Sequence, residues 1–319
     1  CAAVKRMEYL LSPCLVKILA IFGLLLLLKW AIFIIYQLKN IIYLYFISKN
    51  RLHPTNYGEW SVVTGATSGI GYNIAELLAK RSSNVVIVGR NKEILKSMQE
   101  NFEKTYAVKI KVIVKNFIDT NYNDIRKELE ILDIGILVNN VGVSVISGTE
   151  FHTISDESMS DLINTNILSC CAMTQIVLPS MIKKKKGIIV NIGSASNYFP
   201  LKYVGIYPAS KKFVNFFTET LTHEYPFHKY GIYFNCINPF YVSTKMSKVR
   251  SGFGIPTPEE YALSSIDTFE YNGESNGYFL HHIFFIASCI APSFIINWFS
   301  NSAMDKLKRK YDKYMKKAK

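Results

Sequence analysis

Short apolar runs alternate with segments whose apolar residues recur every three to four positions over most of this chain. The runs predict buried strands at Trp60–Val63, Asn84–Val88, Ile110–Val114, Ile136–Asn139, Gly187–Ile192 and Ile232–Ile237. The periodic segments predict helices at Ile70–Lys80, Asn91–Lys104, Ser158–Ile182 and Tyr207–Glu224. Strands that alternate with helices form a parallel sheet covered on both faces. We therefore expect an α/β fold with a doubly wound parallel sheet, in a single domain over residues 60–275.

A continuous apolar stretch precedes this domain, at residues 15–47. Its few polar interruptions are Lys17, Lys29 and the Lys39-Asn40 pair. Because about 20 apolar residues cross a bilayer as a helix, residues 1–50 predict a membrane anchor, formed by one long tilted helix or by a tight pair of segments. A cleaved signal peptide is the alternative, but no small-residue cleavage site follows the apolar core. Residues 51–59 then predict a linker.

Composition also favours a membrane surface as a partner. Hydrophobic residues make up 49% of the 319 residues and the mean hydropathy is +0.13. The net charge of +13 would suit nucleic acid, anionic lipid or an anionic substrate, but the sequence has neither zinc-finger spacing nor an aromatic RNA-binding signature. We therefore expect no nucleic-acid partner.

The sequence predicts neither a disulfide framework nor a metal site. The sequence has six cysteines, Cys1, Cys14, Cys170, Cys171, Cys236 and Cys289. No two of them form a C-x-x-C pair. This spacing is typical of free thiols in a reducing compartment. His281 and His282 are expected to be structural or interfacial, and no further His, Cys or Asp pattern suggests a metal ligand set.

A glycine-rich turn, Thr64 to Gly71, follows the first predicted strand and opens the first predicted helix. Its glycines allow a pyrophosphate to approach the backbone, and the helix N-terminus supplies amide donors and partial positive charge. The turn predicts a dinucleotide site in a Rossmann-like sheet. The expected contacts are Gly65, Thr67, Ser68, Gly69, Ile70 and Gly71.

Arg90 follows the second predicted strand, where an NAD enzyme holds the ribose hydroxyls with a carboxylate. A guanidinium can bind a 2′-phosphate bidentately, whereas a carboxylate would repel it. NADPH is therefore the predicted cofactor. The alternative is that Arg90 only decorates the start of the next helix.

Tyr207 and Lys211 are four residues apart on a predicted helix, so their side chains share one face. An ammonium beside a phenol favours the phenolate, and we expect it to lower the pKa of Tyr207 from about 10 toward neutrality. Tyrosine could then donate and accept a proton. Other pairs share this spacing, at Tyr45/Lys49, Tyr198/Lys202, Tyr225/Lys229 and Tyr241/Lys245. Tyr207 differs because Ser194 and an apolar strand precede it.

Together these motifs resemble the short-chain dehydrogenase/reductase family from about Trp60 to the C-terminus. The resemblance rests on Thr64–Gly71, Asn139-Asn140-Val141-Gly142, Asn166, Ser194, and Tyr207 with Lys211. It implies that Ser194 binds the substrate carbonyl and that Tyr207 protonates its oxygen as hydride arrives. Lys211 would lower the tyrosine pKa and bind the nicotinamide ribose, and Asn166 would hold a water-linked proton relay. Further cofactor contacts are implied for Asn116, Asn139, Val141, Val242 and Thr244.

Three positions depart from the family pattern without removing a catalytic group. Asn116 stands where an aspartate near the adenine is usual, so we expect a weaker contact there. Gly193 precedes Ser194 where a second serine is common. Pro208 follows Tyr207, which the first turn of a helix tolerates.

Narrower features are similar to the endoplasmic-reticulum branch that contains very-long-chain 3-oxoacyl-CoA reductase and related 17β-hydroxysteroid dehydrogenases. These are Ile134–Gly142, Met173–Pro179, Phe240–Met246, Asn276–Tyr278 and the anchor. The branch implies a membrane-bound reductase that converts a 3-oxoacyl-CoA to a 3-hydroxyacyl-CoA in fatty-acid elongation. A 17-ketosteroid reductase is the alternative, and a non-catalytic membrane adaptor is a remote one. The further expected partners are membrane lipid, other elongation enzymes and a second copy of the chain.

The sequence of the C-terminal region, residues 276–319, is compatible with several structures and roles. Its apolar part, Tyr278 to Phe299 with a break at Pro292, would cover an acyl chain, dip into the membrane or form a buried core helix. The last residues, Lys316-Lys317-Ala318-Lys319, resemble a dilysine retrieval signal, with a bare basic tail as the alternative. The signal implies an endoplasmic reticulum membrane protein whose catalytic domain and C-terminus face the cytosol.

Two groups of basic residues are expected at opposite edges of the predicted sheet. Ligands of such sheets bind beyond the C-terminal ends of the strands. Lys183–Lys186 precedes a strand, so it predicts a solvated turn at the opposite edge. Lys245, Lys248 and Arg250 follow a strand and are candidates for phosphate contacts.

Overall fold

The computed structural model describes residues 13–48, 51–144 and 149–317, and the chain divides after Ile47 into two compact units. In the first unit, helix α2 (Pro13–Ile42) continues into a π-helical turn, η1 (Tyr43–Ile47). The apolar stretch therefore forms one continuous helix and not a pair of segments.

The helical stretch Leu15–Ile47 has a mean hydropathy of 2.7, and none of its most apolar window is buried within the structure. At 1.5 Å per residue its 33 residues extend about 50 Å, more than the ~30 Å core of a bilayer, so a tilted span fits its length. Asp156–Lys184 also has the length and composition of a span, but 56% of its window is buried. Burial of that kind is typical of a core helix.

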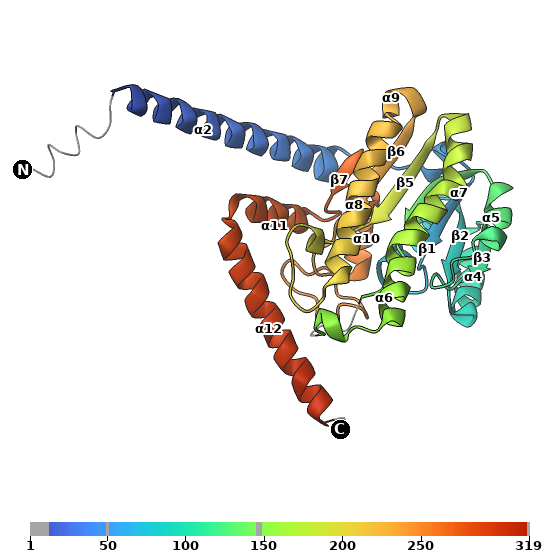
Figure 1. The fold of residues 1–319 in the computed structure, drawn as a ribbon. Helices are drawn as coiled ribbons and strands as arrows, with labels where there is room; N and C mark the ends of the chain where they lie inside the picture. Colours follow the sequence, from blue (N-terminus) through green and yellow to red (C-terminus); the bar gives the residue numbers. More distant parts are fainter. Residues whose placement is uncertain (1–12, 49–50, 145–148, 318–319) are drawn as a thin grey trace, which may run out of the picture. The chain divides into compact units, whose positions relative to one another are not determined.

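The second unit is built on a parallel sheet of seven strands (Figure 1). They are β1 (Trp60–Thr64), β2 (Asn84–Gly89), β3 (Ile110–Val114), β4 (Ile134–Asn139), β5 (Gly187–Ile192), β6 (Ile232–Ile237) and β7 (Gly273–Ser275). Their order is β3-β2-β1-β4-β5-β6-β7, and all neighbours are parallel. This confirms the predicted doubly wound α/β fold. The edge strand β7 is not among the strands that the sequence predicts.

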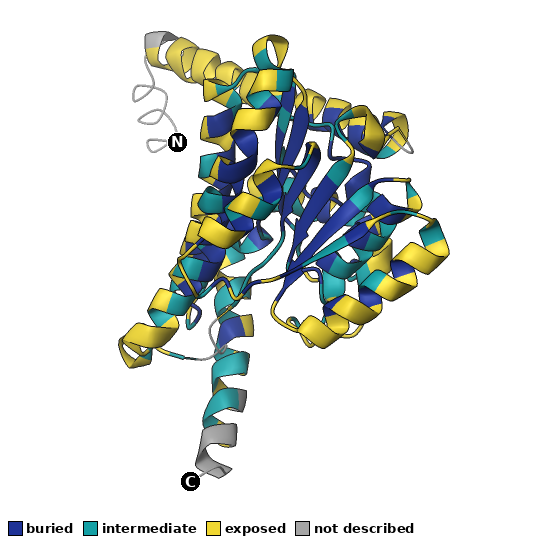
Figure 2. Cartoon of the chain, turned by 90° about the vertical axis from the view of Figure 1, so that its right-hand side faces the viewer, coloured by how far each residue is buried: buried dark blue, intermediate teal, exposed yellow. Residues whose placement is uncertain are grey.

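Helices cover both faces of this sheet, and the strands between them are buried (Figure 2). One face carries α3 (Gly69–Lys80), α4 (Lys92–Tyr106) and α10 (Pro258–Ile266), and the other carries α5 (Asn123–Glu130), α7 (Ser169–Lys184) and α8 (Ile206–Glu224). Successive strand residues point to opposite faces, so Val63 packs in one core cluster and Val62 in the other. Covering both faces explains why the strands are continuous apolar runs.

The helix predicted over Ser158–Ile182 forms within one continuous helical stretch, Asp156–Lys184, which contains a π-helical turn. α6 (Asp156–Ile163) is followed by a π-helical turn, η4 (Asn164–Leu168), before α7 begins. The remaining short elements, which the sequence does not predict, are η2 (Pro54–Asn56), η3 (Phe151–Thr153), η5 (Ala195–Asn197) and α9 (Phe227–Tyr230).

The C-terminal region of the second unit forms two helices joined by a short turn at Pro292, which we call the C-terminal hairpin. α11 (Phe279–Ile290) ends just before Pro292, and α12 (Ser293–Lys317) begins just after it. His281 and His282 of α11 are buried. The basic tail that the sequence predicts is therefore the second half of a long helix, because Pro292 is compatible with a helix start but ends the preceding helix.

The lysine run at residues 183–186 lies just before β5. It is therefore at the N-terminal edge of the sheet, as the sequence predicts. Lys183 and Lys184 end α7, and Lys185 adopts a left-handed conformation with φ of 52°. The run is not a fully solvated turn, because Lys184 Nζ donates to Asp133 Oδ1 at 2.7 Å and to the Ile134 carbonyl at 2.7 Å. That lysine instead fastens α7 to the start of β4.

Candidate active site

The glycine-rich turn lies between β1 and α3, at the point where the strand order reverses from β1 to β4. Ligands of doubly wound sheets bind in the crevice at such a switch point. Gly65 and Gly69 have φ of +66° and +62°, a region that favours glycine. Ser68 precedes α3 without a side-chain capping bond, so the first amides of the helix are available to an anionic group.

Asn140 connects this turn to the end of β4 through hydrogen bonds. It belongs to the predicted Asn139–Gly142 motif, but the sequence predicts no role for it. Its Nδ2 donates to the carbonyls of Thr64 at 3.0 Å and Gly65 at 3.2 Å. A Cβ atom at Gly71 would lie 2.2 Å from the same nitrogen. The glycines of the turn are therefore needed for close packing against Asn140 as well as for any approach of a ligand.

The predicted adenine-side residues lie at the ends of the next two strands. Arg90 follows β2 directly and its side chain is exposed. Asn116 lies two residues beyond β3, is exposed, and accepts a long bond from the amide of Ile118 at 3.4 Å. Asn139, in contrast, turns its side chain into the domain, where Nδ2 donates to Asn191 Oδ1 at 2.9 Å. The predicted contact of Asn139 with a cofactor would therefore have to come from its backbone.

Val242 and Thr244 lie in the segment after β6, which passes close to the glycine-rich turn. A Cβ atom at Gly69 would lie 3.5 Å from Thr244 Cγ2, and Val242 is buried. Lys245, Lys248 and Arg250 are exposed on the same segment, on the C-terminal side of β6 where the sequence places them.

Tyr207 lies in the first turn of α8, in hydrogen-bond contact with Ser194. The sequence predicts that Lys211 lowers the pKa of this tyrosine. In the structure burial raises the pKa of Tyr207, and only the bond with Ser194 lowers it. The predicted direction is wrong, because a desolvated phenolate costs more than the phenol. The phenol therefore keeps its proton, as a proton donor must.

Lys211 is buried one turn further along α8. Its Nζ donates to the Ile192 carbonyl at 2.8 Å and lies 5.9 Å from the centre of the Tyr207 ring. Burial lowers the pKa of the ammonium. The ammonium is thus held at the end of β5, beside the phenol but oriented by a main-chain oxygen.

Asn166 lies in the π-helical turn η4 and is only 2% exposed. Its Nδ2 donates to the Val143 carbonyl at 2.9 Å and to Ser210 Oγ at 3.0 Å, while its Oδ1 accepts from the Val143 amide at 2.8 Å. π-Helical turns are frequent at functional sites. A Cβ at Gly142 would lie 3.4 Å from Lys211 Nζ and 3.5 Å from Asn166 Oδ1, so both side chains reach one place.

Asn238 positions Ser194 and explains the glycine before it. The Asn238 Oδ1 atom accepts from the Ser194 amide at 3.0 Å and from Asn197 Nδ2 at 2.8 Å. A Cβ at Gly193 would lie 2.0 Å from that oxygen. A second serine at this position would therefore displace the amide that orients the Ser194 loop.

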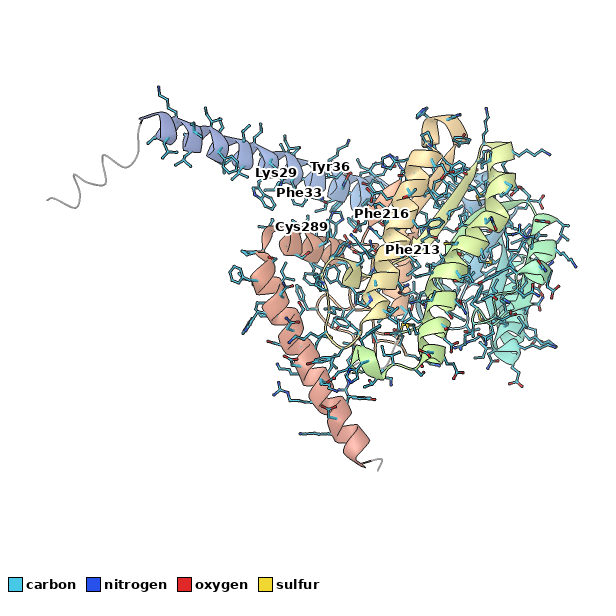
Figure 3. All side chains as sticks on the ribbon, viewed as in Figure 1. Lys29, Phe33, Tyr36, Phe213, Phe216 and Cys289 are labelled. Carbon is cyan, nitrogen blue, oxygen red and sulfur yellow. The ribbon has the colours of Figure 1, made fainter. Side chains whose placement is uncertain are left out.

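A cavity of about 510 Å³ lies between the C-terminal hairpin and the segment that begins at Ser194, the predicted catalytic segment. Tyr198, Phe199 and Pro200 line it from the segment that begins at Ser194, and Lys212 lines it from α8. The hairpin contributes Phe285, Ser288, Cys289, Ala291, Ser293, Ile296 and Asn297. Cys289 of α11 and the exposed Phe213 and Phe216 of α8 are labelled in Figure 3.

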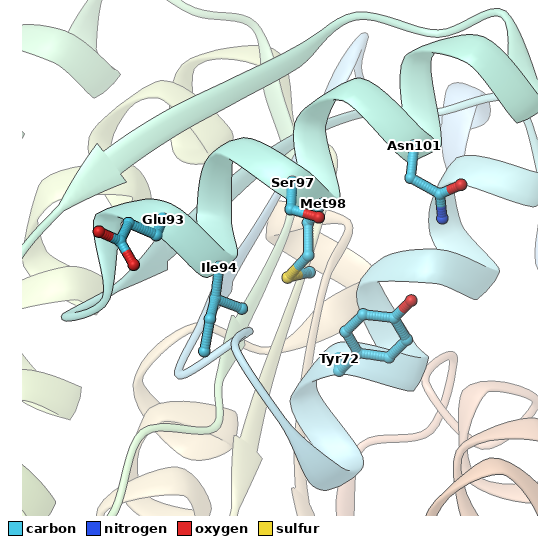
Figure 4. Close-up of a pocket in the computed structure, with 6 residues that line it drawn as sticks. All are labelled: Tyr72, Glu93, Ile94, Ser97, Met98 and Asn101. Atoms are coloured by element: carbon cyan, nitrogen blue, oxygen red, sulfur yellow. The ribbon is translucent and has the colours of Figure 1, made fainter.

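A second cavity, of about 380 Å³, lies between α3 and α4 (Figure 4). Its lining residues are Tyr72, Glu93, Ile94, Ser97, Met98 and Asn101. None of the predicted catalytic side chains lines either cavity. The larger cavity is lined by the residues that follow Ser194, whereas Glu93 makes the smaller one unsuited to a phosphate.

Metal ligands and disulfides do not contribute to the site in the described part of the chain. Among these residues, no group of three or more His, Cys, Asp or Glu side chains could hold a metal ion. Cys170, Cys171, Cys236 and Cys289 form no disulfide. His281 is structural: its Nδ1 accepts from the Phe240 amide at 3.3 Å, and its Nε2 faces the Gly254 carbonyl at 3.1 Å.

The crevice combines a cradle for a dinucleotide pyrophosphate with a protonated tyrosine, a serine hydroxyl and a buried lysine. Such a site belongs to an oxidoreductase that uses a nicotinamide cofactor.

Comparison with known proteins defines the family. The family model for short chain dehydrogenase matches residues 59–252. Very-long-chain 3-oxoacyl-CoA reductase-B of Danio rerio is 39% identical over 253 residues, which cover 78% of this chain and 81% of that protein. Hydroxysteroid dehydrogenase-like protein 1 of Gallus gallus is 39% identical over 251 residues, which cover 76% and 75%.

A solved structure agrees with this result. A short-chain dehydrogenase from Sphingobium yanoikuyae in complex with NADPH superposes with a TM-score of 0.62 at 25% identity, covering 68% of this chain and 86% of that one. The chain belongs to the short-chain dehydrogenase family, and it is an oxidoreductase that depends on a nicotinamide cofactor.

Proposed function

We propose that this protein is a membrane-bound, NADPH-dependent reductase that converts a 3-oxoacyl-CoA to a 3-hydroxyacyl-CoA in the elongation of very long fatty acids. One observation carries the proposal. Ser194, Tyr207, Lys211 and Asn166 are all present around one crevice, in a chain whose relatives include several very-long-chain 3-oxoacyl-CoA reductases.

In the proposed reaction, the Ser194 hydroxyl donates a hydrogen bond to the 3-oxo oxygen and orients the carbonyl. When bound, NADPH supplies the hydride that adds to the carbonyl carbon. The Tyr207 hydroxyl gives its proton to the oxygen, so that C=O becomes CH–OH. Burial favours this direction, because it raises the pKa of Tyr207 and keeps the phenol protonated. Lys211 would bind the nicotinamide ribose, and Asn166 would hold the path by which the proton is replaced.

The preference for NADPH over NADH rests on Arg90. Its guanidinium is exposed immediately after β2, and neither Gly89 nor Asn91 beside it carries a carboxylate. A 2′-phosphate would find a bidentate donor there, and no acidic group to repel it.

The acyl chain would occupy the 510 Å³ cavity beside the catalytic segment. Tyr198 follows Ser194 by four residues and packs its ring on Phe285 of α11 at 4.8 Å between ring centres. Apolar residues such as Phe199 and Ile296 provide contacts for methylene groups. Lys212 of α8 also lines the cavity. A cavity of this kind would make the enzyme sensitive to chain length.

The cellular setting that we propose is the endoplasmic reticulum membrane, with the catalytic domain in the cytosol. The apolar helix Leu15–Ile47, whose most apolar window is unburied, would anchor the protein there. The retrieval signal predicted at residues 316–319 includes Ala318 and Lys319, which lie outside the described residues. Other elongation enzymes are the partners that would supply the substrate, and a homo-oligomer is compatible with this setting.

A 17-ketosteroid is the second candidate substrate. The relative from Gallus gallus whose name refers to hydroxysteroid dehydrogenase has the same 39% identity as the reductase from Danio rerio. A steroid ketone would use the same Ser194 and Tyr207 groups, so the pocket alone would distinguish the two substrates. A membrane adaptor without activity is the remaining alternative.

The test follows NADPH oxidation by the full chain in detergent, with a long-chain 3-oxoacyl-CoA and separately with a 17-ketosteroid. We expect turnover of the thioester, lost by about 10²-fold or more in Tyr207→Phe, since general acid catalysis contributes on that scale. Tyr225→Phe is the matched control, because Tyr225 and Lys229 share the same spacing. Turnover of the steroid alone would overturn the substrate. Nucleotide binding without Tyr207-dependent turnover of either compound would favour the adaptor.

A further inference from the structure

The C-terminal hairpin exposes a group of large apolar side chains, which we call the aromatic strip. It consists of Ile290, Phe294, Ile295, Trp298 and Phe299. Phe294 is 71% exposed, and Trp298 and Phe299 are each 64% exposed. Soluble surfaces expose single large apolar residues often, but five within ten positions are unusual and indicate a contact surface.

Helix geometry places the α12 members of the strip together. Residues one, four and five positions apart fall on one side of a helix, so Phe294, Ile295, Trp298 and Phe299 project in similar directions. The sequence from Ser275 to Met304 contains no Asp, Glu, Lys or Arg. The hairpin tip therefore carries no charge that would oppose contact with an apolar phase.

The same side of α12 becomes basic further along. Lys306, Arg309 and Lys313 are exposed, and we call them the basic strip. Lys313 is eighteen residues after Ile295, which is five full turns, so the two project in the same direction. Lys306 begins this strip about 10 Å along the axis from Phe299, at 1.5 Å per residue. One face of α12 thus changes from aromatic to cationic over the depth of a lipid headgroup layer.

The hairpin is fixed to the domain on its other side, so the strips cannot simply turn inward. His281 fastens α11 to the segment after β6 through the Phe240 amide and the Gly254 carbonyl. On α12, Met304 is buried, and Lys308 Nζ lies 3.4 Å from Glu150 Oε1. Asp305 pairs with Lys202 at 3.6 Å. These contacts hold the aromatic strip outward.

We propose that the aromatic strip docks into the interface of a bilayer that contains anionic lipid, while the basic strip contacts the lipid headgroups. Tryptophan and phenylalanine at the level of the headgroups, followed by lysine and arginine, are the composition of interfacial helices. Each basic side chain gains from the negative potential of an anionic leaflet. The protein then meets the membrane through a second contact besides α2, and this contact belongs to the catalytic domain.

A second copy of the chain is a poorer occupant. A two-fold dimer built on this face would align the two α12 helices so that each basic strip meets the other or meets the partner's aromatic strip. Either arrangement removes cationic groups from water without an opposite charge. A bilayer with anionic headgroups satisfies both strips at once, and this inference does not depend on the proposed reductase reaction.

The test uses the full chain in nanodiscs, because α2 would retain any variant on a membrane and only a local signal reports on the hairpin. The sequence has three tryptophans, Trp30, Trp60 and Trp298. The emission of Trp298 is obtained as the difference between the native protein and Trp298→Phe. We expect lipids brominated on their acyl chains to quench this difference at least two-fold, and aqueous acrylamide to quench it weakly.

Lipid composition tests the basic strip. We expect stronger quenching by brominated chains when phosphatidylserine is present, and loss of that dependence when Lys306, Arg309 and Lys313 are all changed to glutamate. The matched control changes three exposed lysines remote from the hairpin, Lys96, Lys104 and Lys109, to glutamate, and it should keep the dependence.

Two outcomes would overturn the proposal. If acrylamide quenches Trp298 and brominated chains do not, the strip faces water. If neither quencher reaches Trp298, another protein surface covers the strip, and a second copy is then identified by the mass of the particle. Binding of NADPH by Trp298→Phe shows that the variant is folded.

Discussion

Thr64, the last residue of β1, accepts two hydrogen bonds from Asn140, the residue that follows the neighbouring strand β4. Asn140 Nδ2 donates to the Thr64 carbonyl at 3.0 Å, and the Asn140 amide donates to Thr64 Oγ1 at 3.0 Å. The Val141 amide donates to the same hydroxyl at 3.1 Å. These bonds fix the glycine-rich turn at the switch point, so the shape of the cofactor site depends on β4 as much as on β1.

Gly71→Ala tests this dependence. The added Cβ would lie 2.2 Å from Asn140 Nδ2 and 2.6 Å from the Gly65 carbonyl, so one of them has to move. We expect the NADPH dissociation constant, measured by cofactor fluorescence, to rise about ten-fold or more, which corresponds to ~1.4 kcal/mol. Gly252→Ala is the control, because nothing lies within 4 Å of its Cβ. Equal affinity in both variants would contradict the assigned site.

Arg90→Asp tests the cofactor preference. Loss of charge-assisted bonds worth ~1.5–3 kcal/mol should raise the Michaelis constant for NADPH by roughly 10–100-fold. The constant for NADH should not rise, since NADH has no 2′-phosphate. Lys104→Asp, at the far end of α4, changes charge equally and should leave both constants unaltered. An unchanged preference in Arg90→Asp would remove Arg90 from the cofactor site.

Ile296→Trp tests the acyl cavity. The larger side chain fills space that Phe199 and Phe285 also line, so kcat/KM for a long-chain 3-oxoacyl-CoA should fall by about ten-fold, the scale of a few methylene contacts. A short-chain 3-oxoacyl-CoA should be reduced at the native rate. Ile295→Trp is the matched control, because Ile295 is the neighbouring residue but does not line the cavity. If both chain lengths respond alike, the chain lies elsewhere.

Because His281 is buried, we expect the folded protein to become less stable in acid. Burial lowers its pKa to about 4, from an ordinary value near 6.5 in the unfolded chain. The unfolded state therefore binds protons more readily, and the free energy of unfolding falls as pH decreases from about 6.5 toward 4, by up to ~1.4 kcal/mol per pH unit. Protonation would also put an N–H opposite the Phe240 amide, which now donates to Nδ1.

Urea unfolding at several pH values checks this dependence. His282 has its pKa lowered to about 4 by burial as well, so the native protein should show the sum of both effects. We expect His281→Asn to reduce the slope of stability against pH, and His223→Asn, at an exposed position on α8, to leave it unaltered. A slope that persists unchanged in His281→Asn would assign the acid sensitivity to other groups.

The sequence was sufficient to predict six of the seven strands, and it predicted Asn166, Ser194, Tyr207 and Lys211, which the structure brings to one crevice. Runs such as Ile232–Ile237 are apolar because helices cover both faces of the sheet, so burial was visible in the composition of each strand. The three-residue strand β7 was not predictable, because Gly-Glu-Ser carries no apolar pattern. It joins the sheet only through its bonds to β6.

Tertiary contacts decided the points on which local patterns were misleading. The apolar spacing around Asn166 correctly predicts a helix, but it does not predict the π-helical turn within that helix, where the Asn166 side-chain amide bonds to Val143 and Ser210. The spacing of Tyr207 and Lys211 predicts a lowered tyrosine pKa, but burial of both groups reverses the direction. Desolvation depends on every element packed around a group, and the four-residue spacing contains no information about it.

The amino-acid sequence by itself therefore determined the fold class, the glycine-rich turn and the set of candidate catalytic residues, because periodicity and motif spacing are local properties. Only the tertiary structure decided that Asn140 closes the turn, that Gly193 leaves room for Asn238, and that α11 and α12 expose their apolar side while His281 is buried. These features depend on contacts between residues far apart in the chain, and no local pattern specifies which distant side chain fills a given space.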